Sequence, residues 1–380
     1  MSVLTASIHS SLPQVVVRLT VMAAALLTAV LGHAQVAVTN LVTDDQTVNA
    51  AAITDAHLQN AWGISSSTSS PFWVSANATG LANLYSVDPT TNVTSKVGLE
   101  VSIPGDGSVT GQTFSNIAGS FNGDTFLFVN EDGTVSGWRN ALGTTAETLQ
   151  AASANNVYKG ATLFNNSGNV YLYAANFRAG TIDVFKGNAG APSLTGTFTD
   201  PAIPTGYAPF NIQNLAGKLY VTYAQQDATK HDDVAGAGNG FVDAFDTNGT
   251  LLGRIATQGP LNSPWGLTIA PSSFGPIAGD LLVGNFGDGK INAFNLTTLA
   301  ADGPLKDVTN APIAIDGLWG LTIGNGGLGG SNGKVYFSAG PSDESHGLFG
   351  VLTGVPEPAS WILLTIGSIG VFVRRLRSRG

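Results

Sequence analysis

The densest group of ionisable side chains in the sequence lies in one short segment. It contains Asp227, His231, Asp232 and Asp233, with Lys230 among them. Carboxylate oxygens that are close in sequence suit Ca²⁺, and a neighbouring imidazole could admit a transition metal. The spacing matches no EF-hand loop. Two interpretations therefore stay open: a metal or ligand site, and a solvated loop held by local ion pairs.

Asparagine and tryptophan recur at related points of the chain and form a second group of candidates. The asparagines that end an apolar strand segment are Asn77, Asn130, Asn176 and Asn285. Asparagine favours the left-handed turn after a strand, and its amide oxygen could also face a ligand. The tryptophans that precede a glycine are Trp62, Trp265 and Trp319. They predict packing between repeated units first, and a stacking platform for a ligand second.

Groups for nucleophilic catalysis are scarce. The chain has no cysteine, which excludes thiol chemistry, disulfides and cysteine-ligated zinc. After residue 34 the histidines are His57, His231 and His346. No Gly-x-Ser-x-Gly elbow stands between a strand and a helix. We therefore predict no catalytic residue.

Internal repeats indicate which elements must position these side chains. Six units of the chain open with the same short motif. It consists of an aromatic or polar residue, a small residue and an aliphatic residue, and we align its copies at residues 62, 116, 160, 211, 265 and 319. Each unit continues with two strand-like segments joined by a turn containing Asn or Gly, such as 72–77 and 84–87. Alternating β-branched and aromatic residues around such turns predict antiparallel hairpins.

Six such units predict an all-β, six-bladed β-propeller with four-stranded antiparallel blades. A single blade cannot bury both of its faces, so the blades must stack around a ring. Glycine contributes 48 of the 380 residues and charged residues only 11%. This high glycine content and low charge content fit many short strands and tight turns. We expect the glycine of the repeated motif to line the crowded axis.

The N-terminus carries an export signal in its composition. Arg18 precedes an apolar run over 19–31, and the small residues Gly32 and Ala34 follow it two positions apart. A basic residue, a short apolar run and a small-residue cleavage site are typical of a secretory signal peptide, here cut after Ala34. We assign residues 1–34 to the signal peptide and 35–353 to the propeller.

The C-terminus has three parts in a fixed order. Pro356, Glu357 and Pro358 come first, an apolar run over 361–373 follows, and a basic end begins with Arg374 and Arg375. This layout, over 354–380, resembles the PEP-CTERM sorting signal of bacteria that produce exopolysaccharide. The resemblance implies recognition by an exosortase-type membrane peptidase and cleavage near the motif. A simple C-terminal anchor is the alternative, and in either case the arginines are expected to stay cytoplasmic.

Charge restricts the partners of the region between these ends. Residues 35–354 contain 11 basic and 24 acidic residues, a net charge of −13. Such an acidic body disfavours nucleic acid and anionic lipid. It remains compatible with neutral or cationic ligands and with Ca²⁺.

The pattern of repeats over residues 40–353 resembles that of six-bladed TolB-like and NHL-type propellers. Among these it resembles a bacterial family of secreted propellers with PEP-CTERM tails. The most particular segment is 225–234, continuing to 240–245. The architecture also resembles gluconolactonase-type propellers, in which Asn, Asp and Glu converge on a central Ca²⁺ that polarises a lactone carbonyl. The equivalents here are mostly Asn, and no matching general base is evident.

Two hypotheses about function follow. The first is an exported, non-catalytic propeller at the cell surface or in the extracellular matrix. It would bind a polysaccharide or protein through its top-face loops, after transient membrane anchoring by the C-terminal helix. The second is a Ca²⁺-dependent hydrolase or lactonase of the gluconolactonase-like type.

Overall fold

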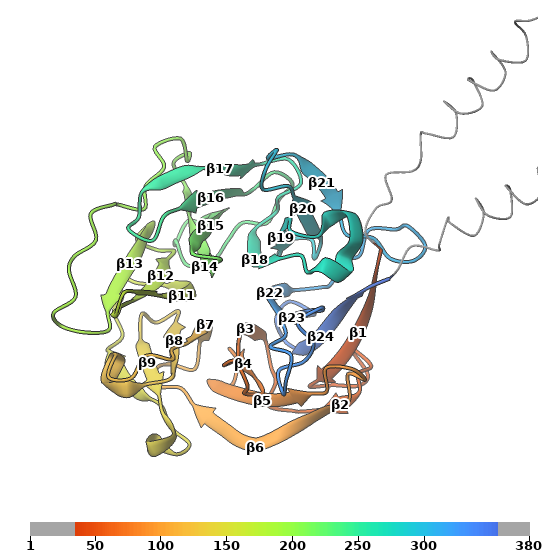
Figure 1. The fold of residues 1–380 in the computed structure, drawn as a ribbon, viewed down its shortest axis with the longest axis horizontal. Coiled ribbons are helices and arrows are strands. Elements are labelled where there is room, and N and C mark those ends of the chain that lie inside the picture. The colour runs from red at the N-terminus through yellow and green to blue at the C-terminus, as the bar shows by residue number, and fades with distance from the viewer. Residues whose placement is uncertain (1–34, 356–380) are drawn as a thin grey trace, which may run out of the picture. The chain divides into compact units, whose positions relative to one another are not determined.

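The computed structural model describes residues 35–355, which form six sheets arranged as blades around a ring (Figure 1). The prediction of a six-bladed, antiparallel β-propeller is confirmed. The predicted signal peptide, residues 1–34, and the sorting residues Pro356, Glu357, Pro358, Arg374 and Arg375 lie outside the described residues.

The first three blades follow the chain in order, each from its inner strand outward. Blade one contains β3 (Ala61–Ser65), β4 (Phe72–Ala76), β5 (Leu81–Val87) and β6 (Thr94–Ser102). Blade two contains β7 (Val109–Phe114), β8 (Phe126–Asn130), β9 (Val135–Trp138) and β10 (Glu147–Gln150). Blade three has three strands, β11 (Tyr158–Asn166), β12 (Asn169–Asn176) and β13 (Thr181–Lys186).

The remaining blades include the closure of the ring. Blade four contains β14 (Tyr207–Leu215), β15 (Lys218–Gln225), β16 (Phe241–Phe245) and β17 (Leu251–Thr257). Blade five contains β18 (Pro264–Ile269), β19 (Leu281–Asn285), β20 (Ile291–Phe294) and β21 (Ala301–Pro304). Blade six contains β22 (Leu318–Ile323), β23 (Val335–Ala339), β24 (Leu348–Gly354) and then β1 (Val36–Thr43) and β2 (Ile53–Thr54). Since β1 pairs antiparallel with β24, the first strand of the chain completes the last blade.

Helical structure in the described region is limited to three short 3₁₀ turns. They are η1 (Phe121–Gly123), η2 (Asn140–Leu142) and η3 (Ser272–Ile277). Between residues 35 and 355 there is no helix with the length and apolarity needed to cross a membrane.

The hydrophobic core lies between neighbouring blades. Trp73 of blade one stacks on Phe126 of blade two, with ring centroids 4.0 Å apart. On its other side, blade one places Phe72 4.5 Å from Tyr336 of blade six. All these side chains are buried, so each blade covers a face of the next, as the repeat argument requires.

The inner strands crowd together at the axis, and glycine makes this possible. A Cβ added at Gly63 would lie 2.5 Å from the carbonyl oxygen of Thr110 in the next blade. A Cβ at Gly320 would lie 2.7 Å from the carbonyl oxygen of Trp62. Both distances are far below van der Waals contact. The expectation that the repeated glycine lines the axis is therefore confirmed.

The alignment of blade two is wrong. The motif that we placed at residue 116 lies after the inner strand. The residues of blade two that correspond to Trp62 and Gly63 are Thr110 and Gly111 on β7. This strand has no aromatic residue before its glycine, so it lacks the Trp-Gly signal that marks blades one, five and six. In blades three and four the alignment is one residue late, because Lys159 and Phe210 are the equivalents of Trp62.

Candidate functional site

Every inner strand contains, in its first half, an irregular register that aims one side chain at the axis. In blade five, Pro264 pairs with Asn285 and Gly266 with Gly284, which leaves Trp265 as the extra residue. The same shift occurs in the other five inner strands. A β-bulge redirects a side chain in this way. The redirected residues are Trp62, Thr110, Lys159, Phe210, Trp265 and Trp319. We call the end of the ring where they gather the top face, and the opposite end the bottom face.

Aromatic side chains plug the axis at the top face. Trp62 stacks on Trp319 with centroids 3.7 Å apart and an interplanar angle of 29°. Phe286 covers the other face of Trp319 at 3.9 Å, and Trp265 meets Trp62 edge-on at 6.2 Å. The three tryptophans are at most 2% exposed. Trp319, sandwiched between two rings, presents no free face to a ligand.

Below the plug the axial channel is almost filled. The cavity that remains has a volume of about 10 Å³ and is lined by Gly63, Gly111, Gln213 and Gly320, among others. That is room for about one water molecule. A substrate therefore cannot pass along the axis of this conformation.

Lys159 takes the place of an aromatic residue in the plug. Its side chain is 3% exposed, and its ammonium nitrogen lies 5.2 Å from the centroid of the Trp62 ring. Nζ donates hydrogen bonds to Glu131 and, at 3.2 Å, to Oδ1 of Asp232. The buried cation is thus held by two carboxylates from neighbouring blades and by one ring face.

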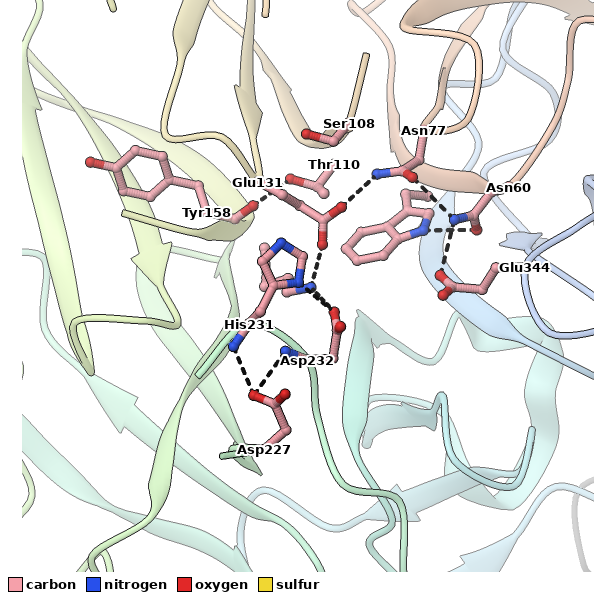
Figure 2. A network of polar contacts seen from close by, with 12 residues as sticks. Asn60, Asn77, Ser108, Thr110, Glu131, Tyr158, Asp227, His231, Asp232 and Glu344 are labelled. Carbon is pink, nitrogen blue, oxygen red and sulfur yellow. Dashed lines mark hydrogen bonds and ion pairs between the residues drawn. The ribbon is translucent and has the colours of Figure 1, made fainter. Parts of the chain in front are cut away.

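A chain of amides extends this network across the top face (Figure 2). Asn77 Nδ2 donates to Glu131 Oε2 at 3.2 Å, and Asn60 Nδ2 donates to Asn77 Oδ1 at 3.2 Å and to Glu344 Oε1 at 3.0 Å. Asn60 Oδ1 accepts the indole hydrogen of Trp62 at 2.8 Å. The network therefore fixes the plug and joins residues from blades one, two, three, four and six.

The segment 227–233 is part of the same face. Asp227 accepts hydrogen bonds from the hydroxyl of Thr229 at 2.6 Å and from the backbone amide of His231 at 2.9 Å. It therefore shapes its own loop, which brings Nδ1 of His231 within 2.8 Å of Oδ1 of Asp232. The side chains of Asp232 and His231 are 66% and 38% exposed. They are the accessible edge of the network.

Charge pairing controls the protonation of this site. Burial would lower the pKa of Lys159, but Glu131 and Asp232 outweigh it and raise that pKa. Burial would raise the pKa of Asp232, but the Lys159 charge and the His231 hydrogen bond lower it. Burial raises the pKa of Glu344 and of Asp233. The centre of the network therefore stays an ion pair at neutral pH.

Only part of the predicted metal set converges. Glu131, His231 and Asp232 offer ligand atoms that lie within 4.8 Å of one another. Asp227 and Asp233 are not in this group. The Lys159 ammonium contacts both carboxylates, so a positive charge already occupies the space between them. A bound cation would have to displace it.

A second cluster of the same kind lies on blade one. Asp55, His57 and Glu100 could also hold an ion by distance. Lys96 pairs with Asp55 at 2.7 Å and with Glu100 at 2.6 Å. Here too a lysine supplies the countercharge.

The four predicted asparagines do not occupy equivalent positions. Asn130 pairs with the first residue of its inner strand, as Asn176 and Asn285 do in their blades, but the counterpart in blade one is Ala76. Asn77 lies one residue further and faces the network. The other three are buried, and their amides bind nearby groups such as Pro104 O at 3.0 Å for Asn130 and Pro260 O at 2.8 Å for Asn285.

Four residues of the network were not predicted from the sequence: Asn60, Glu131, Lys159 and Glu344. Lys159 had a visible signal, because it stands before Gly160 where three other blades have Trp before Gly. Glu131 occupies the position of Asn77, one residue after the second strand of its blade. Asn60 and Glu344 lie in irregular loops, so no pattern marks them.

Sequence comparison identifies the C-terminal signal. Residues 354–378 match the PEP-CTERM protein-sorting motif. The motif implies export, a cell-envelope location and processing by an exosortase-type system.

Solved structures that resemble the chain do so at low identity. The hydrazine synthase of Kuenenia stuttgartiensis is 12% identical, with a TM-score of 0.46, over 74% of this chain and 77% of its own. The PQQ-bound aldose sugar dehydrogenase of Streptomyces coelicolor is 12% identical, with a TM-score of 0.46, over 84% of this chain and 98% of its own. These likenesses are too distant to inform function.

Relatives at higher identity come from Acanthamoeba polyphaga mimivirus. "Uncharacterized protein L690" is 36% identical over 201 residues, 52% of this chain and 51% of its own length. "Uncharacterized protein R648" is 32% identical over 294 residues, 72% of this chain and 70% of its own length. The chain therefore belongs to the same protein family as "Uncharacterized protein R648" of this virus.

Proposed function

We propose that the chain is an exported, non-catalytic binding propeller whose top face recognises a polysaccharide or protein of the cell surface or extracellular matrix. The observation that supports this proposal is the network centred on Lys159. It gathers polar side chains from five blades onto one rigid face, as binding sites on rigid scaffolds commonly do.

The accessible groups of the network suit hydrogen-bonded recognition. Asp232 and His231 are exposed at its edge, and Asn77 and Glu131 are partly exposed behind them. Together they offer carboxylate, imidazole and amide groups to a hydroxyl-bearing or amide-bearing ligand. The buried Lys159 compensates part of the negative charge, so an uncharged partner can approach.

A Ca²⁺-dependent hydrolase or lactonase is the second candidate, since Glu131, His231 and Asp232 lie close enough to share an ion. Lys159 argues against it, because a divalent cation between those carboxylates would leave a buried ammonium without its partners.

Binding of exopolysaccharide from the producing culture, and of its matrix proteins as a separate fraction, tests the first function. Asp232→Asn and His231→Ala should each weaken binding to one fraction about tenfold. Asp246→Asn, in the turn between β16 and β17, makes the same charge change away from the top face and should bind as the parent does. If both top-face variants bind like the parent, the proposal is wrong.

Metal analysis distinguishes the second function. The purified parent protein and Glu131→Gln are compared for bound Ca²⁺ and for turnover of lactones and esters. One equivalent of metal that disappears in the variant, together with turnover, would replace the binding proposal by the hydrolase.

We further propose that residues 1–34 are removed on export, that 35–353 is the mature propeller, and that 354–380 is cleaved near Pro356, Glu357 and Pro358 after transient anchoring. Intact-mass measurement of the exported protein should find an N-terminus at Gln35 and a shortened C-terminus. Glu357→Ala should retain the tail, whereas Ser360→Ala should be processed. A tail retained in the parent would leave the simple anchor as the explanation.

A further inference from the structure

The bottom face of the ring contains a hollow of a different chemical character. It has a volume of about 490 Å³ and is formed where the inner strands of blades one, two, three, four and six end. That size is typical of ligand pockets. None of the described residues that line it carries an ionisable side chain, although the body of the chain has a net charge of −13.

Several polar side chains of this hollow have no hydrogen-bond partner among residues 35–355. Ser66, Thr113, Asn116 and Gln213 line it, and none of their side chains makes a hydrogen bond to another residue between 35 and 355. Each hydroxyl or amide can both donate and accept. The hollow therefore presents a set of unused neutral hydrogen-bonding groups around one opening.

The backbone that carries these groups is held in place. Asn325 Nδ2 donates to the carbonyl oxygens of Ser67 and Ser70, both at 2.8 Å, which ties the first loop of blade one to blade six. Gln112 Nε2 donates to Gly63 O at 2.8 Å and to Trp73 O at 3.1 Å. The opening is thus preorganised, which reduces the entropy lost on binding.

Apolar surface lies between the polar groups. Phe114, Leu163 and Ile323 line the same hollow, and Ile323 is 43% exposed. A second hollow of about 590 Å³ adjoins the first and shares Thr68 and Asn325 with it. The two hollows meet at these residues and form one depression, whose combined space is more than a single compact ligand fills.

We propose that this depression binds an uncharged polyhydroxylated chain, such as a neutral oligosaccharide of several units. The ligand's hydroxyls would pair with the free hydroxyl and amide groups, and the less polar faces of its rings would cover the apolar residues. A charged ligand would find no countercharge in the first hollow. In the second hollow Asp88 is the one ionisable residue among the described lining, and its carboxylate already accepts hydrogen bonds from the amides of Thr90 and Thr91. A charged ligand would therefore lose hydration with little compensation. This proposal is independent of the top-face function, since the two sites share no residue.

Calorimetric titration of the purified full chain tests the proposal. The probes are the neutral hexasaccharides of glucose, mannose and xylose, with hexaguluronate as the charged comparison. We expect at least one neutral hexasaccharide to bind, and hexaguluronate to bind at least tenfold more weakly. Gln213→Ala and Thr113→Val should each weaken the neutral interaction at least fivefold.

Asn155→Ala, an exposed position in the loop before β11, is the control and should bind within twofold of the parent. Asp232→Asn, in the proposed top-face site, reports which face holds the saccharide. The proposal is overturned if no neutral hexasaccharide binds at millimolar concentration, if hexaguluronate binds equally well, or if the two bottom-face variants bind like the parent. Loss of binding in Asp232→Asn alone would assign the saccharide to the top face instead.

Discussion

The ammonium group of Lys159 lies 5.2 Å from the ring centroid of Trp62, and its charge is shared by Glu131 and Asp232. Lys159 is therefore part of two features of the ring. It closes the aromatic plug of the axis, and it is the centre of the polar network on the top face. Changes at Lys159 should therefore affect both the stability of the ring and the recognition surface.

Removing the charge of Lys159 should destabilise the protein strongly. Lys159→Met leaves the mostly buried Glu131 carboxylate without its cation, which we expect to lower the free energy of unfolding by about 3 kcal/mol. Urea unfolding of this variant, of Glu131→Gln and of the double variant measures the effect. The double variant should lose less than the sum of the two single losses. Strict additivity would mean that the two groups do not interact.

Replacing the glycine of the inner strand in blade two should destabilise the protein. A Cβ at Gly111 would lie 2.5 Å from the backbone nitrogen of Ala161, so Gly111→Ala must push two inner strands apart. We expect a loss of about 1–3 kcal/mol in thermal or urea unfolding. Gly98→Ala on the outer strand β6 meets no atom within 4 Å and should be neutral or slightly stabilising. Equal effects of the two changes would contradict the proposed crowding.

The plug should contribute substantially to cohesion of the ring. Trp319 is 1% exposed and is sandwiched between Trp62 and Phe286. Trp319→Ala should cost about 3–5 kcal/mol, and Trp319→Phe considerably less. Differential scanning calorimetry gives both values. An unchanged melting temperature for Trp319→Ala would show that the blades hold together without the plug.

One carboxyl group should make stability depend on pH in a predictable direction. Burial and the neighbouring Asp302 raise the pKa of Asp280 to about 6, above its value of about 4 in an unfolded chain. The folded state then binds the proton more tightly, so this stabilisation is present below pH 4 and is lost as the pH rises to 6.

Replacing that carboxyl group should remove the dependence. Asp280→Asn should be more stable than the parent at pH 7.5 by about 1 kcal/mol, with a smaller difference at pH 4.5. Urea unfolding of both proteins at the two pH values measures this difference in stability. Asp246→Asn is the control for charge removal at a turn. A parent protein that gains stability between pH 4.5 and 7.5 relative to Asp280→Asn would refute the assignment.

The blades could be predicted because their signals are local. The hairpin of β19 and β20, for example, is a pair of apolar segments around an Asp-Gly turn, and its pairing depends only on near neighbours. The placement of β1 beside β24 could not be predicted in the same way. Its partner is more than 300 residues away, and an isolated strand pattern does not specify its neighbour.

The candidate site was predictable only in part, because it depends on which residues the bulges turn inward. Trp62 and Lys159 occupy the same position in their blades, yet one is aromatic and the other charged. A repeat search scores Lys159 as a mismatch, although the fold makes it the centre of the network. Asn60 and Glu344 meet across the closure between blades one and six, a contact with no local pattern.

The pairing of β1 with β24 also determines when the molecule can become complete. Val355 N donates to Gln35 O at 2.8 Å, so the two ends of the described chain meet at one point. Because this contact has the largest sequence separation in the fold, its loop-closure entropy is lost only when the last blade is available. Ring closure should therefore be a late folding step. Until then β24 exposes an unpaired edge, which makes the interval before closure the period of greatest risk of aggregation.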